Sequence, residues 1–180
     1  MECKPWDLFI TLSHQTILRM DKRERYEQLL QEIKALVSKE FELVSNLANV
    51  TALIKERTGF FWVGFYLVGK SASGGKELKL GPFQGPVACY TIGYGKGVCG
   101  AAWRDNKSYV VEDVHLFPGH IACSSLSESE IVVPLHNAEG EVVGVLDIDS
   151  DARADFDTID QRYLEEICSV ISSELFSKFV

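Results

Sequence analysis

The chain has 180 residues, of which 46% are hydrophobic and 11% aromatic, and its formal net charge is −8. This length and composition suit a single globular domain with a proper core. The acidic balance and the absence of a basic stripe argue against nucleic-acid binding and against docking on anionic membranes. No apolar run approaches the ~18 residues of a membrane span, and no signal-peptide pattern opens the sequence, so we expect a cytoplasmic protein.

Two helices are predicted in the first third of the chain. Residues 1–20 show only a weak helical pattern and are expected to be an N-terminal extension to a domain that spans 21–180. Asp21 and Glu24 have the spacing of a capping box, which predicts a helix start. Apolar residues at 3.6-residue spacing predict one buried stripe on that helix: Tyr26, Leu29, Leu30, Ile33, Leu36 and Val37. The second helix is predicted to bury Phe41 and Val44 among others and to stop at Gly59.

Short segments rich in β-branched and aromatic residues follow. The predicted strands are FFWVGFYLV (60–68), ELKLGPF (77–83), VACYTI (87–92), SYVVEDV (108–114), EIVVPLHN (130–137) and EVVGVLDIDS (141–150). A short helix is predicted at 96–106 and a final helix opens near Asp157. Helices, then strands with mostly short connections, then a closing helix predict an α+β domain with an antiparallel central sheet and helices packed against it.

The last predicted strand ends in two carboxylates. Because side chains alternate along a strand, Val143, Val145, Asp147 and Asp149 are expected on one face. Charged side chains are rarely buried without a partner. The pair is therefore either a frayed strand end in solvent or the wall of a pocket that binds a cation. Glu130, at the start of the preceding strand, is a candidate third acid of that pocket.

Five cysteines are distributed unevenly along the chain. Cys89, Cys99 and Cys123 lie in or beside glycine-rich loops, whereas Cys168 lies on the apolar face of the last helix. We expect Cys168 to be buried as a small hydrophobic residue and Cys3 to be incidental. A reducing compartment favours free, catalytic or metal-bound thiols over a structural disulfide framework.

A zinc site and redox chemistry are the two interpretations of the loop cysteines. Zinc would use the three loop cysteines with His115 or His120, but structural zinc usually recruits ligands through CxxC pairs. Here nine and twenty-three residues separate successive loop cysteines, so we expect no metal and no other cofactor. Redox chemistry fits better, since one thiolate can attack and another can trap the resulting sulfenic acid as a disulfide.

Six motifs together resemble the free methionine-(R)-sulfoxide reductases, which are enzymes built on a GAF domain. They occur in the family's order within about residues 22–170: WVGFYL (62–67), LGPFQG (80–85), GVCG (97–100), EDVHLFPGHIAC (112–123), SEIVVPL (129–135) and GVLDIDS (144–150). The resemblance implies a single GAF domain that reduces free methionine-(R)-sulfoxide to methionine.

The resemblance also implies roles for individual residues. Cys123 matches the catalytic cysteine, Cys89 the resolving cysteine that forms a redox disulfide with it, and Cys99 an auxiliary thiol. The implied substrate-binding residues are the acids Glu130, Asp147 and Asp149 and the aromatic residues Trp62 and Tyr66. An acidic trio would pair with the ammonium of a free amino acid, which explains a preference for free over peptide-bound substrate.

The expected partners are the free sulfoxide, thioredoxin as reductant, and a second copy of the chain in a homodimer. The main alternative is a non-catalytic GAF sensor that binds a small molecule or nucleotide, because a fold does not fix a function. Such a sensor has no need for three loop cysteines.

Overall fold

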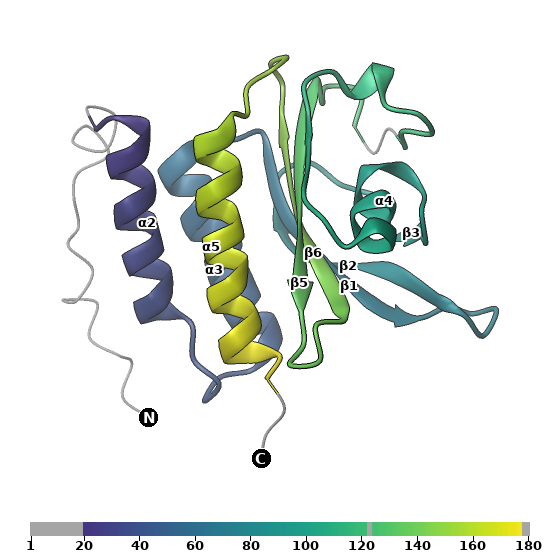
Figure 1. Cartoon of the computed structure of the whole chain (residues 1–180), viewed down its shortest axis with the longest axis horizontal. Helices are drawn as coiled ribbons and strands as arrows, with labels where there is room; N and C mark the ends of the chain where they lie inside the picture. Colours follow the sequence, from purple (N-terminus) through teal and green to yellow (C-terminus); the bar gives the residue numbers. More distant parts are fainter. Residues whose placement is uncertain (1–19, 122–123, 178–180) are drawn as a thin grey trace.

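A six-stranded sheet separates a layer of three helices from a layer of loops and one short helix in the computed structural model, which describes residues 20–121 and 124–177 (Figure 1). The strand order is β3-β2-β1-β6-β5-β4, and all neighbouring strands are antiparallel. The strands are β1 (Trp62–Lys70), β2 (Lys76–Gln84), β3 (Thr91–Gly93), β4 (Tyr109–Val111), β5 (Ser129–His136) and β6 (Val142–Ser150). The predicted α+β class and antiparallel sheet are confirmed.

The helices begin and end close to the predicted signals, except at the start of the second helix. They are α2 (Lys22–Leu36), α3 (Leu43–Thr58), α4 (Gly97–Asp105) and α5 (Thr158–Leu175), with a 3-10 turn at Val114–Leu116. The capping box of Asp21 and Glu24 is present at the start of α2, and Asp157 caps α5 in the same way. Helix α3 ends at Gly59, whose left-handed conformation (φ 77°) suits glycine. The predicted extension lies outside the described residues except for Met20, and no helix of the described part is long and apolar enough to cross a membrane.

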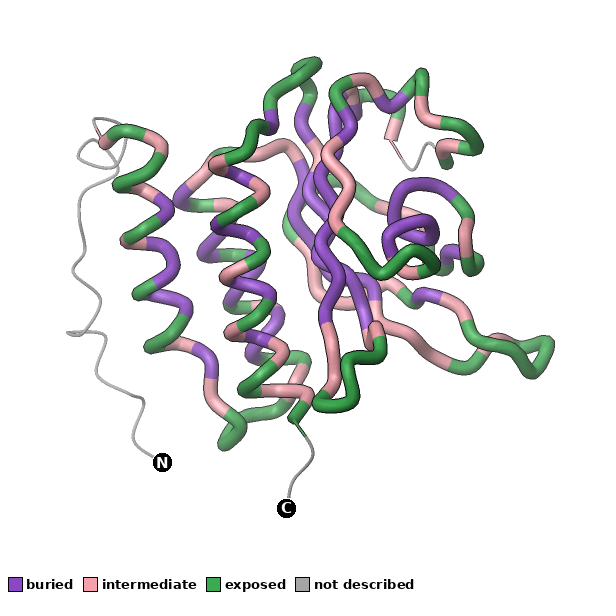
Figure 2. Tube along the Cα trace, viewed as in Figure 1, coloured by how far each residue is buried: buried purple, intermediate pink, exposed green. Residues whose placement is uncertain are grey.

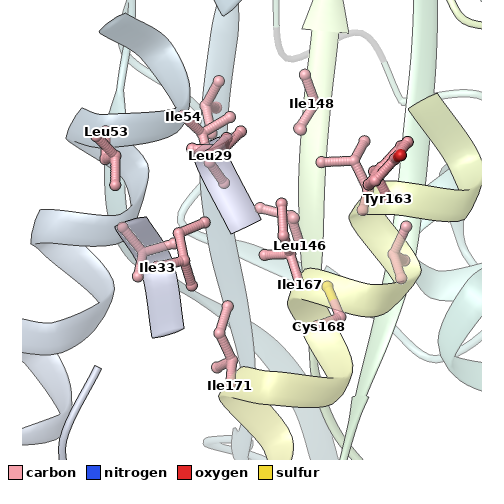
Figure 3. Close-up of a cluster of buried hydrophobic side chains, with 14 of the residues drawn as sticks. Leu29, Ile33, Leu53, Ile54, Leu146, Ile148, Tyr163, Ile167, Cys168 and Ile171 are labelled. Atoms are coloured by element: carbon pink, nitrogen blue, oxygen red, sulfur yellow. The ribbon is translucent and has the colours of Figure 1, made fainter. Parts of the chain in front are cut away.

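The main apolar core lies between the sheet and α2, α3 and α5, where buried positions of helices and strands face one another (Figure 2). Figure 3 shows Leu146 and Ile148 of β6 in the same cluster as Ile167 and Cys168 of α5. Cys168 is a free thiol buried in this cluster, so the prediction for it is confirmed.

Hydrogen bonds and ion pairs connect the helices of the helix layer, which consists of α2, α3 and α5. The Arg57 side chain of α3 donates two hydrogen bonds to the Glu32 carboxylate of α2, at 2.9 and 3.2 Å. Asp160 of α5 is fully buried, accepts a hydrogen bond from the Tyr26 hydroxyl at 2.8 Å and forms an ion pair with Lys22. These contacts hold the three helices together and pair the buried charges of Glu32, Arg57 and Asp160, whereas the buried Nε of Arg25 in α2 has no hydrogen bond within the described part of the chain.

Several predicted boundaries are wrong. Helix α3 begins only at Leu43, and the side chains predicted to be buried at its start are exposed, Phe41 by 50% and Val44 by 61%. The predicted strand 87–92 is reduced to Thr91–Gly93, because the chain before it follows Pro86, which has no N–H, and lies in an exposed loop. The predicted strand 108–114 is likewise limited to Tyr109–Val111.

Val143 lies on the opposite face from the one predicted. The register between β5 and β6 shifts where Leu135 pairs with Gly144 and His136 pairs with Val142. Such a bulge adds a residue to one strand and interrupts the alternation of side chains. Val143 therefore packs against the core under the helices, whereas Val145, beyond the bulge, packs on the opposite face.

Candidate active site

Three carboxylates gather on the sheet face that points away from α2, α3 and α5. Glu130 of β5 pairs directly with Asp149 of β6, and Val132 pairs with Asp147, so these side chains project to the same side. Glu130 and Asp147 are only 6% and 7% exposed. The interpretation of Asp147 as part of a frayed strand end in solvent is thus wrong, and a pocket wall is what the structure shows.

Burial dominates the electrostatics of this acidic cluster, by which we mean Glu130, Asp147 and Asp149. Burial and the charges of the two aspartates raise the pKa of Glu130 well above its ordinary value. Burial and the charge of Asp149 raise the pKa of Asp147 in the same way, although contacts with Cys99 and Glu130 oppose the shift. Burial also raises the pKa of Asp149, to about 6, although a hydrogen bond with Ser127 opposes the shift. The cluster therefore retains protons at pH values where ordinary carboxyl groups are ionised.

Cys99 belongs to the first turn of α4 and points at the acidic cluster. Its Sγ lies 3.9 Å from Glu130 Oε1, and the residue is buried. Burial and the neighbouring carboxylates raise the pKa of the Cys99 thiol well above its ordinary value, so it is a thiol at rest. Beside it, the buried Oδ1 of Asp147 accepts no hydrogen bond from the described part of the chain. A buried oxygen without a donor is costly and indicates a place for a ligand.

Two aromatic residues of β1 attach the loop 85–90 to the sheet. Trp62 Nε1 donates a hydrogen bond to the Pro86 carbonyl, and the Tyr66 hydroxyl donates one to the Cys89 carbonyl, both at 3.0 Å. The indole ring fits only because its neighbours have no side chain, since a Cβ would lie 2.2 Å from it at Gly64 and 2.4 Å from it at Gly85. Trp62 and Tyr66 therefore position the segment that carries Cys89, in addition to lining the site.

Two small cavities flank the acidic cluster, and Asp147 and Asp149 line both. One, of about 20 Å³, is otherwise lined by Phe61, Trp62, Tyr66, Val87, Ala88 and Ser124. The other, of about 30 Å³, is lined by Ile92, Gly97, Val98, Cys99, His120, Ile121, Ser127 and Glu130. Among the described residues, no cysteine or aspartate lines a larger cavity of about 710 Å³ beside α5, so we place the chemistry at the two small cavities.

The structure brings together most of the predicted site residues. Cys99 and the three acids are neighbours, and Trp62 and Tyr66 lie on the other side of the aspartates. Cys89 is half-buried and disulfide-bonded. Cys123 and Cys3 lie outside the described residues, so the predicted roles of Cys123 stay predictions.

Sequence reasoning missed Ser127 as a neighbour of the acids. It is buried, lines the cavity and forms the hydrogen bond with Asp149. No periodicity marks it, because it lies in the irregular segment before β5. His120, considered only as a zinc ligand, also lines the cavity, and its Nε2 lies 4.0 Å from Glu130 Oε2.

Comparison with known proteins identifies the class of protein to which the chain belongs. The family model for the GAF domain matches residues 41–175, so the chain is a GAF-domain protein. GAF domain-containing protein A of Dictyostelium discoideum is 52% identical over 157 residues, which cover 87% of this chain and 96% of the relative.

Two further relatives identify the family. The free methionine-R-sulfoxide reductase of Escherichia coli K12 is 42% identical over 157 residues, covering 87% of this chain and 92% of that protein. The X-ray structure of free methionine-R-sulfoxide reductase from Neisseria meningitidis in complex with its substrate superposes with a TM-score of 0.81 at 49% identity. That match covers 86% of this chain and 90% of the other. The chain belongs to the free methionine-R-sulfoxide reductases.

Proposed function

We propose that this enzyme reduces free methionine-(R)-sulfoxide to methionine by thiol chemistry on Cys123. The observation that carries the proposal is the buried acidic cluster with its unpartnered Asp147 oxygen. A substrate ammonium would supply the missing donor and compensate the negative charge. A residue inside a peptide has no ammonium, so the same contact would select the free amino acid.

The surroundings of the cluster suit the rest of the substrate. The aromatic surface of Trp62 and Tyr66 borders the cavity on one side of the aspartates and would contact the methyl-sulfinyl group. Both cavities are far smaller than the ~300 Å³ at the lower end of typical ligand pockets. The loop segments that close them must therefore shift when the substrate binds.

The proposed chemistry transfers one oxygen and two electrons. The Cys123 thiolate attacks the sulfoxide sulfur, the sulfur–oxygen bond of the substrate breaks, and the oxygen ends on Cys123 as a sulfenic acid while methionine leaves. The departing oxygen needs a proton. The raised pKa values of Glu130 and Asp147 would make a protonated carboxyl group available within the proposed site.

Resolution would use a second thiol. The Cys89 thiol attacks the sulfenic sulfur, water leaves, and a Cys89–Cys123 disulfide forms. The disulfide-bonded state of Cys89 and the Tyr66 hydrogen bond to its carbonyl support this role. A thioredoxin-type dithiol would then reduce the disulfide by exchange. A homodimer stays a prediction from the family resemblance, and a cytoplasmic location stays a prediction from the sequence pattern.

The direct test is thioredoxin-coupled turnover of three substrates at equal concentration. We expect turnover of free methionine-(R)-sulfoxide and little or none of the S epimer or of a sulfoxide within a peptide. Equal rates on free and peptide-bound sulfoxide would contradict the proposal. As a control on the nucleophile, Cys123→Ser should release no methionine even in a single turnover, whereas Cys168→Ala, in the distant core, should turn over normally.

A further inference from the structure

The site has the donor atoms of a metal centre, although we expected no metal from the sequence, and these donors differ from the loop-cysteine set that was considered there. Cys99 Sγ and one carboxylate oxygen each from Glu130 and Asp147 lie within 4.8 Å of one another. His120 Nε2 lies 4.0 Å from the second oxygen of Glu130. We propose that the reduced protein binds one Zn²⁺ ion, or a divalent ion of similar chemistry, through Cys99, Glu130, Asp147 and His120.

The donor set fits this class of ion. Zn²⁺ accepts thiolate, imidazole and carboxylate ligands in four-coordinate tetrahedral sites, whereas the harder Mg²⁺ and Ca²⁺ avoid thiolate. Tetrahedral zinc with ordinary bond lengths separates its donor atoms by about 3.3–3.8 Å. The observed spacing therefore needs to contract by about 1.5 Å at most among Cys99, Glu130 and Asp147, which side-chain rotation can provide.

A second observation points to a cation at this place. Asp147 is more than nine-tenths buried, and its Oδ1 has no hydrogen-bond donor within the described part of the chain. All four proposed ligands line the same cavity of about 30 Å³, so the ion would lie within one enclosed space. The ligands come from α4, β5, β6 and the segment before β5, which explains why no CxxC spacing appears in the sequence.

Bound metal would block the reaction. It would take the Asp147 oxygen that the substrate ammonium needs and would hold Cys99 as a thiolate ligand. This inhibitory consequence rests on the proposed function, but the binding of the ion does not.

Binding can be measured on the reduced, metal-free full chain with Co²⁺ as a spectroscopic probe of thiolate and imidazole ligands. We expect one Co²⁺ per chain, a thiolate-to-cobalt charge-transfer band, and loss of the band when one equivalent of Zn²⁺ is added. Cys99→Ser should abolish the band, and Glu130→Gln should weaken binding at least about tenfold, because even outer-shell changes cost that much.

Variants of the other cysteines test whether the cobalt band comes from Cys99 rather than from another thiol. Cys89→Ser and Cys168→Ala should keep the band, and the thermal melting of metal-free Cys99→Ser should match that of the wild type. No binding, or a band that survives Cys99→Ser, would overturn the proposal. If Co²⁺ binds as described but the sulfoxide is not reduced, only the proposed function fails. If the sulfoxide is reduced but no metal binds, only the metal site fails.

Discussion

Asp160 in the helix layer and Asp147 in the site are both buried carboxylates, but only Asp160 has a full set of partners. It accepts hydrogen bonds from the Tyr26 hydroxyl and the Asp157 N–H and pairs with Lys22. Asp147 has an oxygen with no donor and two further carboxyl groups nearby. The helix layer thus uses a paired carboxylate to stabilise the fold, whereas the site keeps a carboxyl group that costs stability when it ionises and that is available to a ligand.

The largest expected effect is on the stability of the helix layer. Asp160→Ala leaves the Tyr26 hydroxyl buried without an acceptor and removes the capping box of α5. We expect a loss of about 3 kcal/mol in the free energy of unfolding, measured by urea denaturation. The kcat/KM of the folded fraction should stay at the wild-type value. If Asp160→Ala were as stable as the wild type, Asp160 would not stabilise the fold, and the proposed difference between Asp160 and Asp147 would be wrong.

The site should show the opposite pattern, with loss of activity and no loss of stability. Asp149→Asn removes a charge that the proposed ammonium contact uses. A charge-assisted hydrogen bond contributes about 1.5–3 kcal/mol, so kcat/KM for the free sulfoxide should fall about ten- to a hundredfold. Ser108→Ala, which removes an exposed hydrogen bond with Glu165, is a matched surface control and should leave kcat/KM unchanged.

The pH dependence of stability sharpens the comparison further. Burial raises the pKa of Asp147 in the folded protein. The protonated side chain therefore costs the fold nothing below the ordinary carboxyl pKa of about 4. As the pH rises from there through the raised pKa of the folded state, the free energy of unfolding decreases. Asp147→Asn has no group that ionises at this position, so this decrease in the free energy of unfolding should disappear. The variant should match the wild type near pH 4 and exceed it by about 1–2 kcal/mol near pH 7.5. A gain that is equal at both pH values, or no gain at all, would contradict the assignment of a costly carboxyl group.

The smallest expected effect concerns the loop that carries Cys89. Tyr66→Phe removes the hydrogen bond to the Cys89 carbonyl, which is worth about 0.5–1.5 kcal/mol. Disulfide closure should therefore slow by roughly two- to tenfold, measured by trapping the sulfenic acid at short times. Tyr109→Phe loses a hydroxyl contact to Asp105 at the surface and is the matched control. Equal closure rates in all three proteins would remove Tyr66 from this positioning role.

Local signals predicted the parts of the site that depend on one strand or one turn. Strand alternation placed Asp147 and Asp149 on one face, and the short connection from β5 to β6 placed Glu130 beside them. The contact between Cys99 and Glu130 could not be predicted in this way, because it depends on how α4 packs across the sheet. Val143 was misplaced because a bulge leaves no mark on the hydrophobic pattern.

The most direct test of the account compares the effect of Asp149→Asn on two substrates. The free sulfoxide has an ammonium and its N-acetyl derivative has none, so the two proteins and two substrates form a double-mutant cycle. If the acidic cluster binds the ammonium, the N-acetyl compound should be a poor substrate of the wild type and should lose little further activity in the variant. A loss by the same factor on both substrates would show that the cluster does not recognise the ammonium, and the explanation for free-amino-acid specificity would fail.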